Sequence, residues 1–406
     1  MNILYIGFDI EGVGGIATYS RYQIRALRDL GHRLFVLSFN KQDVRVERGI
    51  VDRHVAFVNK YRAGVNFLRL LLKRHGRFDA VVINHVYLAI FGWIARAITG
   101  APYVVNVYNI DILTRLASVR EFGFARADLV IADCQYTIDR LPLFHRRIPP
   151  VGLLYDPVDT GFFRPIPKPA ARHEVERRFG LTDLSQRFIV TTVAAMCEPP
   201  NKGHHQTIDA LRLLQDPRFL YIVVGDGIAR PRIEAYAREA GVADQVRFLG
   251  LVDQDALPYL YSAADVAVLV ARGGPGLGEA VPLGLIEASA CGVPFICGNQ
   301  DGSVEAIKAG DPNGFAVDPN EPAKLAARLR ELADSPALCA DMGASGKRFV
   351  DELFVYDRFV ATLGELLARH LGAVAAPSAP DTPAAPPRPA DAARTTVARS
   401  PFDRSI

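Results

Sequence analysis

The chain has 406 residues, half of them hydrophobic, which is enough for two or three domains that each bury a core. The net charge of +3 conceals an asymmetry, because residues 1–168 carry 23 basic and 14 acidic side chains and the remainder is acidic overall. This balance predicts an anionic partner for the first half alone, and no nucleic acid is expected. Five cysteines, an odd number without a C-x-x-C pair, disfavour a disulfide framework and indicate a reducing compartment.

The beginning of the chain shows no targeting segment. Residues 1–8 are apolar but lack a basic leader, and Asp9 follows at once. The most apolar region, residues 80–98, is interrupted by Asn84 and His85, so it predicts a buried strand and a helix rather than a membrane span. The expected location is the cytoplasm, including the inner face of the membrane.

The first predicted element is a short apolar strand at residues 3–8. Gly14 and Gly15 follow, and the apolar and small residues from Ile16 to Leu27 fit one face of a helix. A glycine turn between a strand and a helix lets a phosphate approach the backbone. Gly14 and Gly15 are therefore candidate phosphate contacts, and the alternative is a tight turn that needs glycine only for a positive φ.

Short apolar runs separated by helical patterns continue through the first half. They span residues 34–39, 54–58, 80–83, 103–107 and 129–132. Strands that alternate with helices over about 150 residues predict a doubly wound parallel sheet.

Two basic segments of the first half mix arginines with apolar side chains. Residues 61–78 form a predicted helix that is apolar on one side and carries five basic residues, and residues 140–147 add three arginines. Such a mixture suits the surface of a membrane. It is also typical of a solvated helix face, which is the favoured interpretation for residues 61–78.

A proline-rich segment at residues 153–169 separates the first series from a second one. The second series has expected strands at residues 188–193, 219–224, 246–249, 266–269 and 294–297, and a helix at residues 204–214. Beyond it, residues 311–319 are expected to be a loop, and residues 321–333 and 359–370 to be helices. Two such series predict two Rossmann-like domains that face a central cleft, and ligands bind in these folds outside the carboxyl ends of the strands.

Residues 272–298 hold the densest set of candidate site residues. Glu279 and Glu287 have seven residues between them, and a glycine- and proline-rich loop leads to the first. A helical run from Leu283 to Ala290 carries the second. Because the loop opens a helix, free backbone N–H groups and the positive end of the helix dipole can receive phosphate or sugar oxygens. The alternative is two glutamates that take no part in a site.

With the G-x-x-E-A pattern at residues 284–288 and the A-C-G-V-P pattern at residues 290–294, this spacing resembles the E-x7-E signature of the retaining GT-B glycosyltransferases of family four. The resemblance implies that Glu279 contacts the donor sugar and that Glu287 binds the ribose hydroxyls of the nucleotide. It also places Leu283 among the nucleotide-sugar contacts. The chain departs from the family after the first glutamate, where it has Ala-Val instead of Gly-Phe.

Further segments of the second half match the same family. Lys202 precedes a glycine between a strand and a helix, as in the family's K-G motif, which implies that it neutralises the leaving diphosphate. A loop lysine in water is the alternative. Gly225 and Gly227 would let the backbone approach the nucleotide base, or would form a simple turn. The family's arginine is absent from residues 193–196, so one positive charge for the leaving group is missing.

In the first half, residues 104–116 occupy the place of the family's V-x-x-H-G-x-D/E motif. Tyr108 stands where a histidine is common, and it offers a hydroxyl but no proton acceptor near neutral pH. Asp111 stands at the acidic position, either as an acceptor-side residue or as a helix N-cap. With Glu279, these two are the candidate catalytic residues. Glu305, in a segment like G-G-x-x-E-x-I, is expected to support the fold.

No metal site is expected. The nine histidines show no metal-ligand spacing, and the single D-x-D string, at residues 253–255, precedes a helical run and is interpreted as helix capping. The resemblance implies that lysine and helix N-termini do the electrostatic work of a metal. The nucleotide-diphosphate sugar is then a substrate, and no cofactor is needed.

The resemblance covers residues 1 to about 371 and implies the domain boundaries. An acceptor-side domain spans residues 1–165, a nucleotide-sugar-binding domain residues 166–355, and a helix that crosses back to the first domain residues 356–371. Residues 372–406, rich in alanine and proline, cannot bury a core and are expected to be disordered.

The implied activity is the transfer of a sugar, with retained configuration, from a nucleotide-diphosphate donor to a hydroxyl. The acceptor would be a glycan, a lipid-linked molecule or a small molecule in polysaccharide or lipid-linked glycan assembly, and the basic first domain would contact the membrane. The alternatives are an inactive nucleotide-sugar-binding protein and another GT-B enzyme, such as a sugar-nucleotide epimerase.

Overall fold

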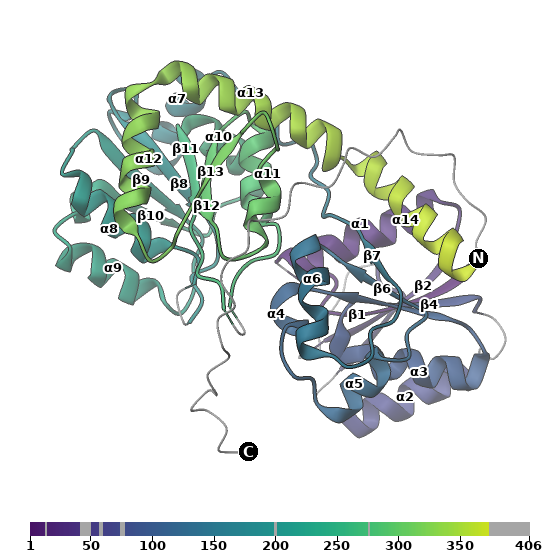
Figure 1. Ribbon diagram of the computed structural model, residues 1–406. Helices are drawn as coiled ribbons and strands as arrows, with labels where there is room; N and C mark the ends of the chain where they lie inside the picture. The colour runs from purple at the N-terminus through teal and green to yellow at the C-terminus, as the bar shows by residue number, and fades with distance from the viewer. Residues whose placement is uncertain are drawn as a thin grey trace.

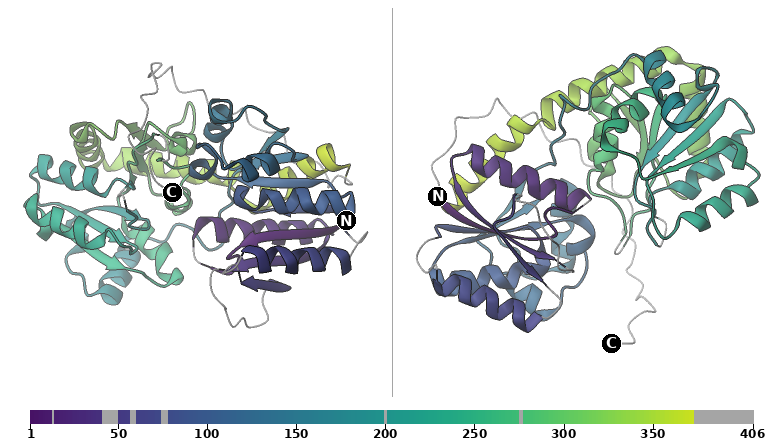
Figure 2. Two further views of the ribbon diagram at one scale, coloured as in Figure 1. Left: turned by 90° about the horizontal axis from the view of Figure 1, so that it is seen from below. Right: turned by 180° about the vertical axis from the view of Figure 1, so that it is seen from behind.

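The computed structural model describes residues 1–12, 14–40, 50–56, 60–73, 78–198, 201–274 and 277–372. This part of the chain forms two lobes, and each is built on its own parallel β-sheet (Figure 1). Helices cover both faces of each sheet, as two further views show (Figure 2). The predicted pair of Rossmann-like α/β domains is therefore confirmed.

The first sheet has seven strands in the order β3-β2-β1-β4-β5-β6-β7, and all neighbours are parallel. The strands are β1 (Asn2–Phe8), β2 (Arg33–Asn40), β3 (Arg53–Ala56), β4 (Ala80–Ile83), β5 (Tyr103–Val107), β6 (Leu129–Ala132) and β7 (Val151–Leu153). The helices of this lobe are α1 (Gly15–Asp29), α2 (Lys60–Lys73), α3 (Ala89–Thr99), α4 (Asn109–Ile112), α5 (Ser118–Phe124) and α6 (Gln135–Phe144).

Successive residues of the central strand β1 point to opposite faces of the first sheet. Leu4 and Ile6 pack in the core beneath α2, α3 and α5, whereas Ile3 and Tyr5 pack beneath α1 and the last helix, α14 (Tyr356–Leu371). This two-sided burial explains why the strands are continuous apolar runs in the sequence.

The second sheet has six parallel strands in the order β10-β9-β8-β11-β12-β13. They are β8 (Phe188–Val193), β9 (Phe219–Val224), β10 (Val246–Gly250), β11 (Val266–Leu269), β12 (Phe295–Gly298) and β13 (Gly314–Val317). One face is covered by α7 (Lys168–Phe179), α10 (Leu257–Ala263), α11 (Leu283–Ala290) and α13 (Pro336–Leu353). The other face is covered by α8 (His204–Leu214), α9 (Arg230–Glu239) and α12 (Pro322–Asp334). Short 3-10 turns are η1 (Val86–Leu88), η2 (Leu184–Gln186), η3 (Ala243–Gln245), η4 (Gln254–Ala256) and η5 (Gly302–Ala306).

Most of the predicted strands have the expected bounds, but two strands and several helices, among them α7, α9 and α13, were not predicted. β13 lies in residues 311–319, which were expected to be a loop, and it exists because β12 offers it a parallel partner. β7 has only three residues and follows two prolines. Parts of the expected strand 54–58 and helix 61–78 lie outside the described residues.

The last helix returns to the first lobe. Val158 donates its backbone N–H to the carbonyl of Phe354 at 2.8 Å, just before α14 begins. On α14, the hydroxyl of Tyr356 donates to Asp29 at the end of α1 at 2.7 Å, and Phe359 packs edge-on against Tyr19, with ring centroids 5.7 Å apart. α14 therefore packs on α1, as Figure 1 shows.

The expected disordered tail from residue 373 lies outside the described residues. Within the described ranges, no helix combines the length and the apolar character that crossing a bilayer requires.

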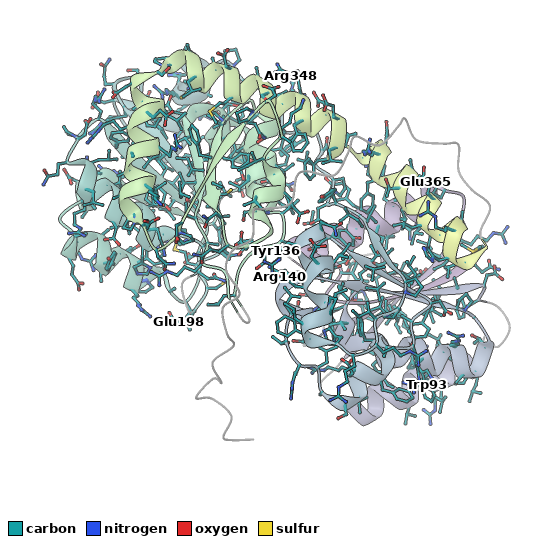
Figure 3. All side chains as sticks on the ribbon, viewed as in Figure 1. Trp93, Tyr136, Arg140, Glu198, Arg348 and Glu365 are labelled. Carbon is teal, nitrogen blue, oxygen red and sulfur yellow. The ribbon has the colours of Figure 1, made fainter. Side chains whose placement is uncertain are left out.

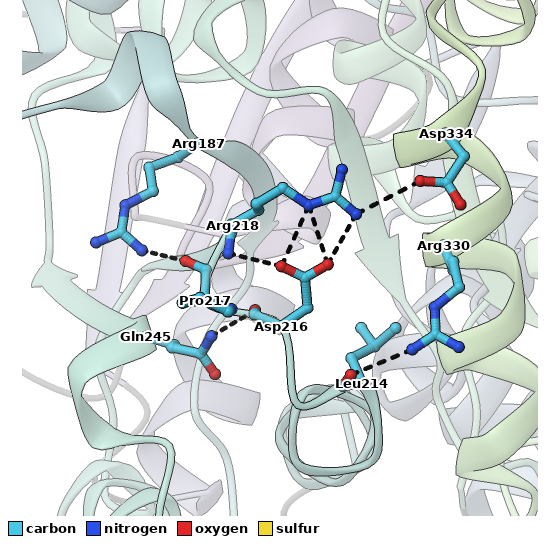
Figure 4. A network of polar contacts seen from close by, with 8 residues as sticks. All are labelled: Arg187, Leu214, Asp216, Pro217, Arg218, Gln245, Arg330 and Asp334. Carbon is cyan, nitrogen blue, oxygen red and sulfur yellow. Dashed lines mark hydrogen bonds and ion pairs between the residues drawn. The ribbon is translucent and has the colours of Figure 1, made fainter.

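A polar network ties the loops at the amino ends of the second sheet to α12 (Figure 4). Asp216 accepts hydrogen bonds from the backbone N–H of Arg218 at 2.9 Å and from its guanidinium at 2.8 Å. The same guanidinium reaches Asp334 at 3.4 Å, and Gln245 donates to the carbonyl of Asp216 at 2.7 Å. The network closes the edge of the sheet opposite to the carboxyl ends, so its role is structural.

Candidate functional site

Two charged side chains selected from the sequence meet at the carboxyl edge of the second sheet. Lys202 follows β8 and comes just before α8, and Glu279 lies between β11 and α11. The Nζ atom of Lys202 lies 2.5 Å from Oε1 of Glu279, and the two side chains are 20% and 13% exposed. The surrounding protein shields this ion pair from water, which makes it stronger than an ion pair on the surface.

The backbone of Glu279 is held on both sides by η5. Its N–H donates to Oδ2 of Asp301 at 2.8 Å, and its carbonyl accepts from the N–H of Gly302 at 2.9 Å. The other oxygen of Asp301 accepts from the N–H of Ser303 at 3.0 Å and so caps η5. Burial raises the pKa of Asp301 to about 6, although these hydrogen bonds oppose the shift. The position of Glu279 therefore depends on η5.

Glu287 lies one turn into α11, and protein surrounds most of its side chain. Its Oε2 accepts a hydrogen bond from the hydroxyl of Tyr261 at 2.7 Å. Burial raises the pKa of Glu287 to about 7, and the hydrogen bond partly offsets the rise. A Cβ atom on Gly284 would lie 3.0 Å from the carbonyl oxygen of Val193, so the first turn of α11 packs closely against the end of β8. This packing puts Glu287 at the same edge of the sheet as β8.

Three helices begin at the candidate site without a capping side chain. Their N-caps are Gly14 for α1, Gly203 for α8 and Pro282 for α11, and none of the three first turns holds an acidic residue. Leu283 is the first residue of α11 and is partly exposed. The first N–H groups of a helix have no partner within the helix, so these ends can receive an anion.

The predicted phosphate contacts Gly14 and Gly15 border open space. Gly14 has φ 127°, which a side chain would rarely adopt, and among the described residues nothing lies within 4 Å of a Cβ atom built at either glycine. A ligand can therefore approach this backbone, although the positive φ also satisfies the turn alternative.

Glycine is required at positions 225 and 227 for a different structural reason. A Cβ atom on Gly225 would lie 2.1 Å from the carbonyl oxygen of Ala194, and one on Gly227 would lie 2.3 Å from that of Met196. Both glycines thus permit close packing of two loops after β8 and β9, which supports the turn alternative. Contact of these glycines with a nucleotide base stays a prediction.

Arg272 brings a positive charge near the start of α8, where the sequence lacks the family's arginine. It is exposed and lies after β11. The pKa of His205, in the first turn of α8, is lowered mainly by burial and further by the charges of Arg232 and Arg272. Arg272 therefore brings a positive charge to the first turn of α8 from the loop after β11.

The carboxyl edge of the first sheet holds Tyr108, Asp111 and a histidine that the sequence analysis did not select. Oδ2 of Asp111 lies 3.1 Å from Nε2 of His85. Because Nδ1 of His85 accepts from the N–H of Tyr87 at 3.2 Å, a neutral ring carries its proton on Nε2 and donates it to Asp111. The N-cap of α4 is Tyr108, so the alternative that Asp111 caps this helix is wrong.

Tyr108 does not present its hydroxyl to solvent. The residue is 8% exposed, and its ring packs edge-on against Tyr19 with centroids 5.6 Å apart. Its hydroxyl has no hydrogen-bond partner among the described residues. Burial also raises the pKa of Tyr108, so the phenol stays protonated.

Other buried polar atoms without a partner among the described residues lie near Tyr108. They belong to Asn109, Asp133 and Asp156, which follow β5, β6 and β7. Burial raises the pKa of Asp133 to about 7, and burial together with the charge of Asp133 raises the pKa of Asp156. These residues carry no motif in the sequence, although Asp133 stands directly after a predicted strand. These buried atoms leave hydrogen-bonding capacity unused at the carboxyl edge of the first sheet.

The two halves of the site face each other. Tyr22 on α1 belongs to the first lobe and Glu287 on α11 to the second. The pKa of Tyr22 is raised by burial, then by the negative charges of Asp159 and Glu287. The carboxylate of Glu287 thus acts electrostatically across the boundary between the lobes.

The D-x-D string does not cap a helix through its side chains. Asp253 is the N-cap of η4 but makes no side-chain capping hydrogen bond, and Asp255 lies 2.9 Å from Arg178. Asp253 therefore occupies the capping position that was expected, but without the side-chain hydrogen bond of a cap. Among the described residues, no group of three or more His, Cys, Asp or Glu side chains could hold a metal ion.

A hollow of about 330 Å³ lies away from these residues. It is lined by the starts of β8 and β12, by Pro165 and Lys168, and by Cys291 and Cys339. The hollow is at the amino ends of the second sheet, whereas Lys202, Glu279 and Glu287 lie at the carboxyl ends. It is not the candidate site.

Two family models match the chain. The model described as glycosyl transferases group 1 matches residues 184–349, and the model described as glycosyl transferase 4-like domain matches residues 14–153. The first match contains β8 to β13, and the second contains α1 to β7. Each match therefore corresponds to one of the two sheets.

Curated relatives include two kinds of glycosyltransferase. A GDP-mannose-dependent alpha-(1-6)-phosphatidylinositol monomannoside mannosyltransferase of Mycobacterium tuberculosis is 33% identical over 226 residues, which is 54% of this chain and 56% of the relative. The chain thus spans little more than half the length of this relative. A D-inositol 3-phosphate glycosyltransferase of Thermobispora bispora is 27% identical over 400 residues, which is 88% of this chain and 90% of the relative.

Solved structures share the fold. HepE of Anabaena in complex with UDP superposes with a TM-score of 0.75 and 20% identity, covering 91% of this chain and 100% of that one. Sucrose-phosphate synthase of Thermosynechococcus elongatus also has a TM-score of 0.75, with 21% identity, covering 91% and 98%.

Proposed function

Because the chain belongs to the group 1 glycosyl transferases, we propose that it transfers a sugar from a nucleotide-diphosphate donor to a hydroxyl acceptor. One observation carries the proposal: Lys202, Glu279 and Glu287 lie at one edge of the second sheet, and η5, which holds the loop of Glu279, contacts α6 of the first lobe. A crevice between two lobes is where an α/β fold of this kind binds its ligand.

In the proposed complex, the second lobe holds the donor. Lys202 and the first N–H groups of α11, beginning at Leu283, contact the diphosphate, and Glu287 accepts hydrogen bonds from the ribose hydroxyls. Glu279 accepts hydrogen bonds from the sugar. The contact between Lys202 and Glu279 supports this arrangement, because it puts a cation for the phosphate next to an anion for the sugar hydroxyls.

Transfer would retain the anomeric configuration and would need no metal. The leaving diphosphate gains negative charge during transfer, and the lysine and the helix N-termini are oriented in advance to stabilise that charge. The backbone at Gly14 and Gly15 is open to a ligand and would reach the diphosphate from the first lobe when the lobes close. In this proposal, side chains and backbone groups of the protein itself stabilise the leaving diphosphate.

Arg272 would supply the positive charge that residues 193–196 lack. Its charge already acts on the first turn of α8, beside Lys202. We expect Arg272→Ala to weaken the binding of GDP and UDP about tenfold, as measured by calorimetry, whereas Arg328→Ala on the surface of α12 should leave binding unchanged. Equal affinities of Arg272→Ala and the wild-type protein would exclude this role.

The acceptor would bind at the carboxyl edge of the first sheet. The pair of His85 and Asp111, in which the Asp111 side chain is partly exposed, offers hydrogen-bonding groups for hydroxyls there. The curated relatives are named for phosphatidylinositol monomannoside and inositol 3-phosphate. A polyhydroxylated acceptor, including a lipid-linked one, is therefore proposed.

A lipid-linked acceptor would bring the first lobe to a membrane. Large apolar side chains are exposed on the outer face of α2 and α5, and arginines lie on or near these helices. The exposed apolar residues are Val65, Leu68 and Leu72 on α2 and Val119 and Phe122 on α5, and the arginines are Arg69 on α2, Arg96 on α3, which pairs with Asp128, and Arg126, whose guanidinium lies over the ring of Phe122. A surface that mixes apolar and basic side chains suits anionic lipid.

The competing proposal is a protein that binds nucleotide sugars without turnover, and the absent arginine favours it. The test is a panel of GDP-mannose, UDP-glucose and UDP-N-acetylglucosamine, in which release of nucleoside diphosphate is measured with and without acceptors. The proposed function predicts slow hydrolysis of at least one donor and faster release with an acceptor. Tight binding without release across the panel would favour the inactive alternative.

A further inference from the structure

Glu305 is a glutamate of the second lobe whose side-chain contacts lie in the first lobe. It belongs to η5 and is 7% exposed. Its Oε2 accepts from the backbone N–H of Gln135 at 2.8 Å, and its Oε1 accepts from the N–H of Tyr136 at 2.6 Å. The hydroxyl of Tyr155, in the segment that joins the two lobes, donates to Oε2 at 2.8 Å. One carboxylate thus accepts two hydrogen bonds from the first lobe and one from the segment that joins the lobes.

These contacts complete a helix that has no cap of its own. α6 begins at Gln135, its N-cap Cys134 makes no side-chain capping hydrogen bond, and no acidic residue lies in its first turn. Glu305 supplies the missing acceptor from the other lobe, and its negative charge is favourable at the positive end of the helix dipole. A hydrogen bond to a charged acceptor is about twice as strong as a neutral one.

Tyr136 makes a second contact between the lobes. Its hydroxyl donates to the carbonyl of Gln300 at 2.9 Å, just before η5. The guanidinium of Arg140 lies 3.5 Å from the centroid of the Tyr136 ring and holds it from the side of α6. Figure 3 shows Tyr136 and Arg140 on the side of α6 that faces the second lobe. The start of α6 is therefore bound to the segment from residue 300 to residue 305.

The same segment holds the loop of Glu279. Asp301 accepts from the N–H of Glu279, and Gly302 donates to its carbonyl. Glu279 in turn contacts Lys202. A continuous path of hydrogen bonds therefore runs from Lys202 through Glu279 and η5 to the first turn of α6.

We infer that Glu305 is a positioning residue, which fixes the first lobe relative to the loop of Glu279 by capping α6 across the boundary between the lobes. The inference rests on the proposed function, in which Glu279 contacts the donor sugar. An acceptor held on the first lobe must reach the donor on the second, and a displacement of about 1 Å in such a geometry costs about a hundredfold in rate. Glu305 is not a catalytic residue, because its carboxylate is occupied by Gln135, Tyr136 and Tyr155.

From the sequence, Glu305 is expected only to support the fold, and kinetics distinguish that role from a positioning role. In Glu305→Gln, one acceptor oxygen becomes an N–H₂ group that faces backbone donors, so the contact between the lobes weakens while the volume stays the same. With the best donor of the panel, we expect kcat to fall at least tenfold and the donor KM to change less than threefold, because the proposed donor contacts remain. Tyr155→Phe removes one hydrogen bond of three and should lower kcat less.

Control variants show whether a lower kcat in Glu305→Gln comes only from lower stability of the fold. Glu331→Gln alters a surface glutamate that pairs with Arg328 on α12, and it should keep wild-type kinetics. The combined Glu305→Gln and Tyr155→Phe variant should be no slower than Glu305→Gln alone, since both changes break the same contact. Wild-type kcat in Glu305→Gln, or a loss that appears only as lower thermal stability, would overturn the inference.

Solution X-ray scattering tests the inference independently of turnover. Full-length wild-type protein and Glu305→Gln are compared with and without saturating UDP and GDP. The inference predicts a larger or more variable separation of the lobes in the variant. Identical scattering curves would contradict it even if no donor of the panel reacted, whereas inactivity of the wild-type protein with a changed curve would contradict only the proposed function.

Discussion

Lys202 and Glu279 stand 77 residues apart in the chain, and their contact depends on β8 and β11 being neighbours in the second sheet. The sequence selected both residues because each lies in a loop between a predicted strand and a predicted helix. It could not give their mutual distance, which follows from the parallel register of the sheet. It also missed His85 and Asp133, because a single polar residue after a strand carries no pattern of its own.

Replacing Lys202 with alanine tests the proposed contact with the diphosphate. Loss of a preorganised contact to a charged transition state lowers kcat about 100-fold to 1,000-fold. Steady-state transfer should therefore fall by that factor in Lys202→Ala, with a small loss of thermal stability because Glu279 loses its partner. Lys324→Ala, which removes a surface lysine paired with Glu321, is the matched control. Near-normal transfer by Lys202→Ala would exclude this role.

The pKa of Glu287, raised to about 7 by burial, predicts that nucleotide binding depends on pH. Ribose hydroxyls donate hydrogen bonds to the carboxylate, so binding favours the deprotonated form and should strengthen as pH rises from 6 to 8, by up to about tenfold per unit below the pKa. Glu287→Gln should bind more weakly and lose this part of the dependence. The titration of the nucleotide itself is common to both proteins, so parallel affinity profiles of wild type and variant would contradict the assignment.

The same pKa shift makes a prediction for stability. The folded-state pKa of Glu287 lies above the value of about 4.5 in the unfolded chain. Ionisation of this group therefore has no effect on stability below pH 4.5, lowers the free energy of unfolding as pH rises from 4.5 to about 7, and has its full destabilising effect above that. Glu287→Gln should therefore gain stability relative to wild type between pH 4.5 and pH 7, by up to about 3 kcal/mol. Asp301 and Asp133 have raised pKa values in the same window, so denaturant unfolding must compare the two proteins at each pH. A difference that does not vary with pH would contradict the shift.

At the scale of elements, the sequence predicts best where a segment is apolar on both faces. β5, β6, β8 and β9 have the predicted bounds because both sides of each strand are buried beneath helices. β13 has a partly exposed centre and starts with glycine, so its four residues resemble a loop until β12 lies beside it. α13 was not predicted, and β7 has only three residues.

At the same scale, we predict that the outer face of α2 and α5 binds membranes that contain anionic lipid. Full-length protein should sediment with vesicles that contain anionic lipid, and less with neutral vesicles or at high salt. The variant Leu68→Glu/Leu72→Glu should lower binding at least tenfold, because two apolar side chains become charged. Leu251→Glu changes an exposed leucine of the second lobe and is the control. Equal binding of both variants, or none by the wild-type protein, would exclude this surface as a membrane contact.

At the scale of the whole molecule, two contacts join the lobes. The family resemblance implied that the last helix returns to the first domain, and α14 does pack on α1, whereas the contact of η5 with α6 through Glu305 was not predicted. Both contacts join residues more than 160 positions apart. Hydrophobic periodicity within one segment carries no information about such pairs, so the return of α14 could be expected only from the resemblance, and the contact through Glu305 comes from the structure alone.

A crystal structure of the protein with bound UDP or GDP tests the central claim most directly. The account predicts that the ribose hydroxyls lie within hydrogen-bond distance of Glu287, and that the diphosphate lies at the first turn of α11 beside Lys202. A nucleotide bound elsewhere, with these two side chains directed away from it, would contradict the account.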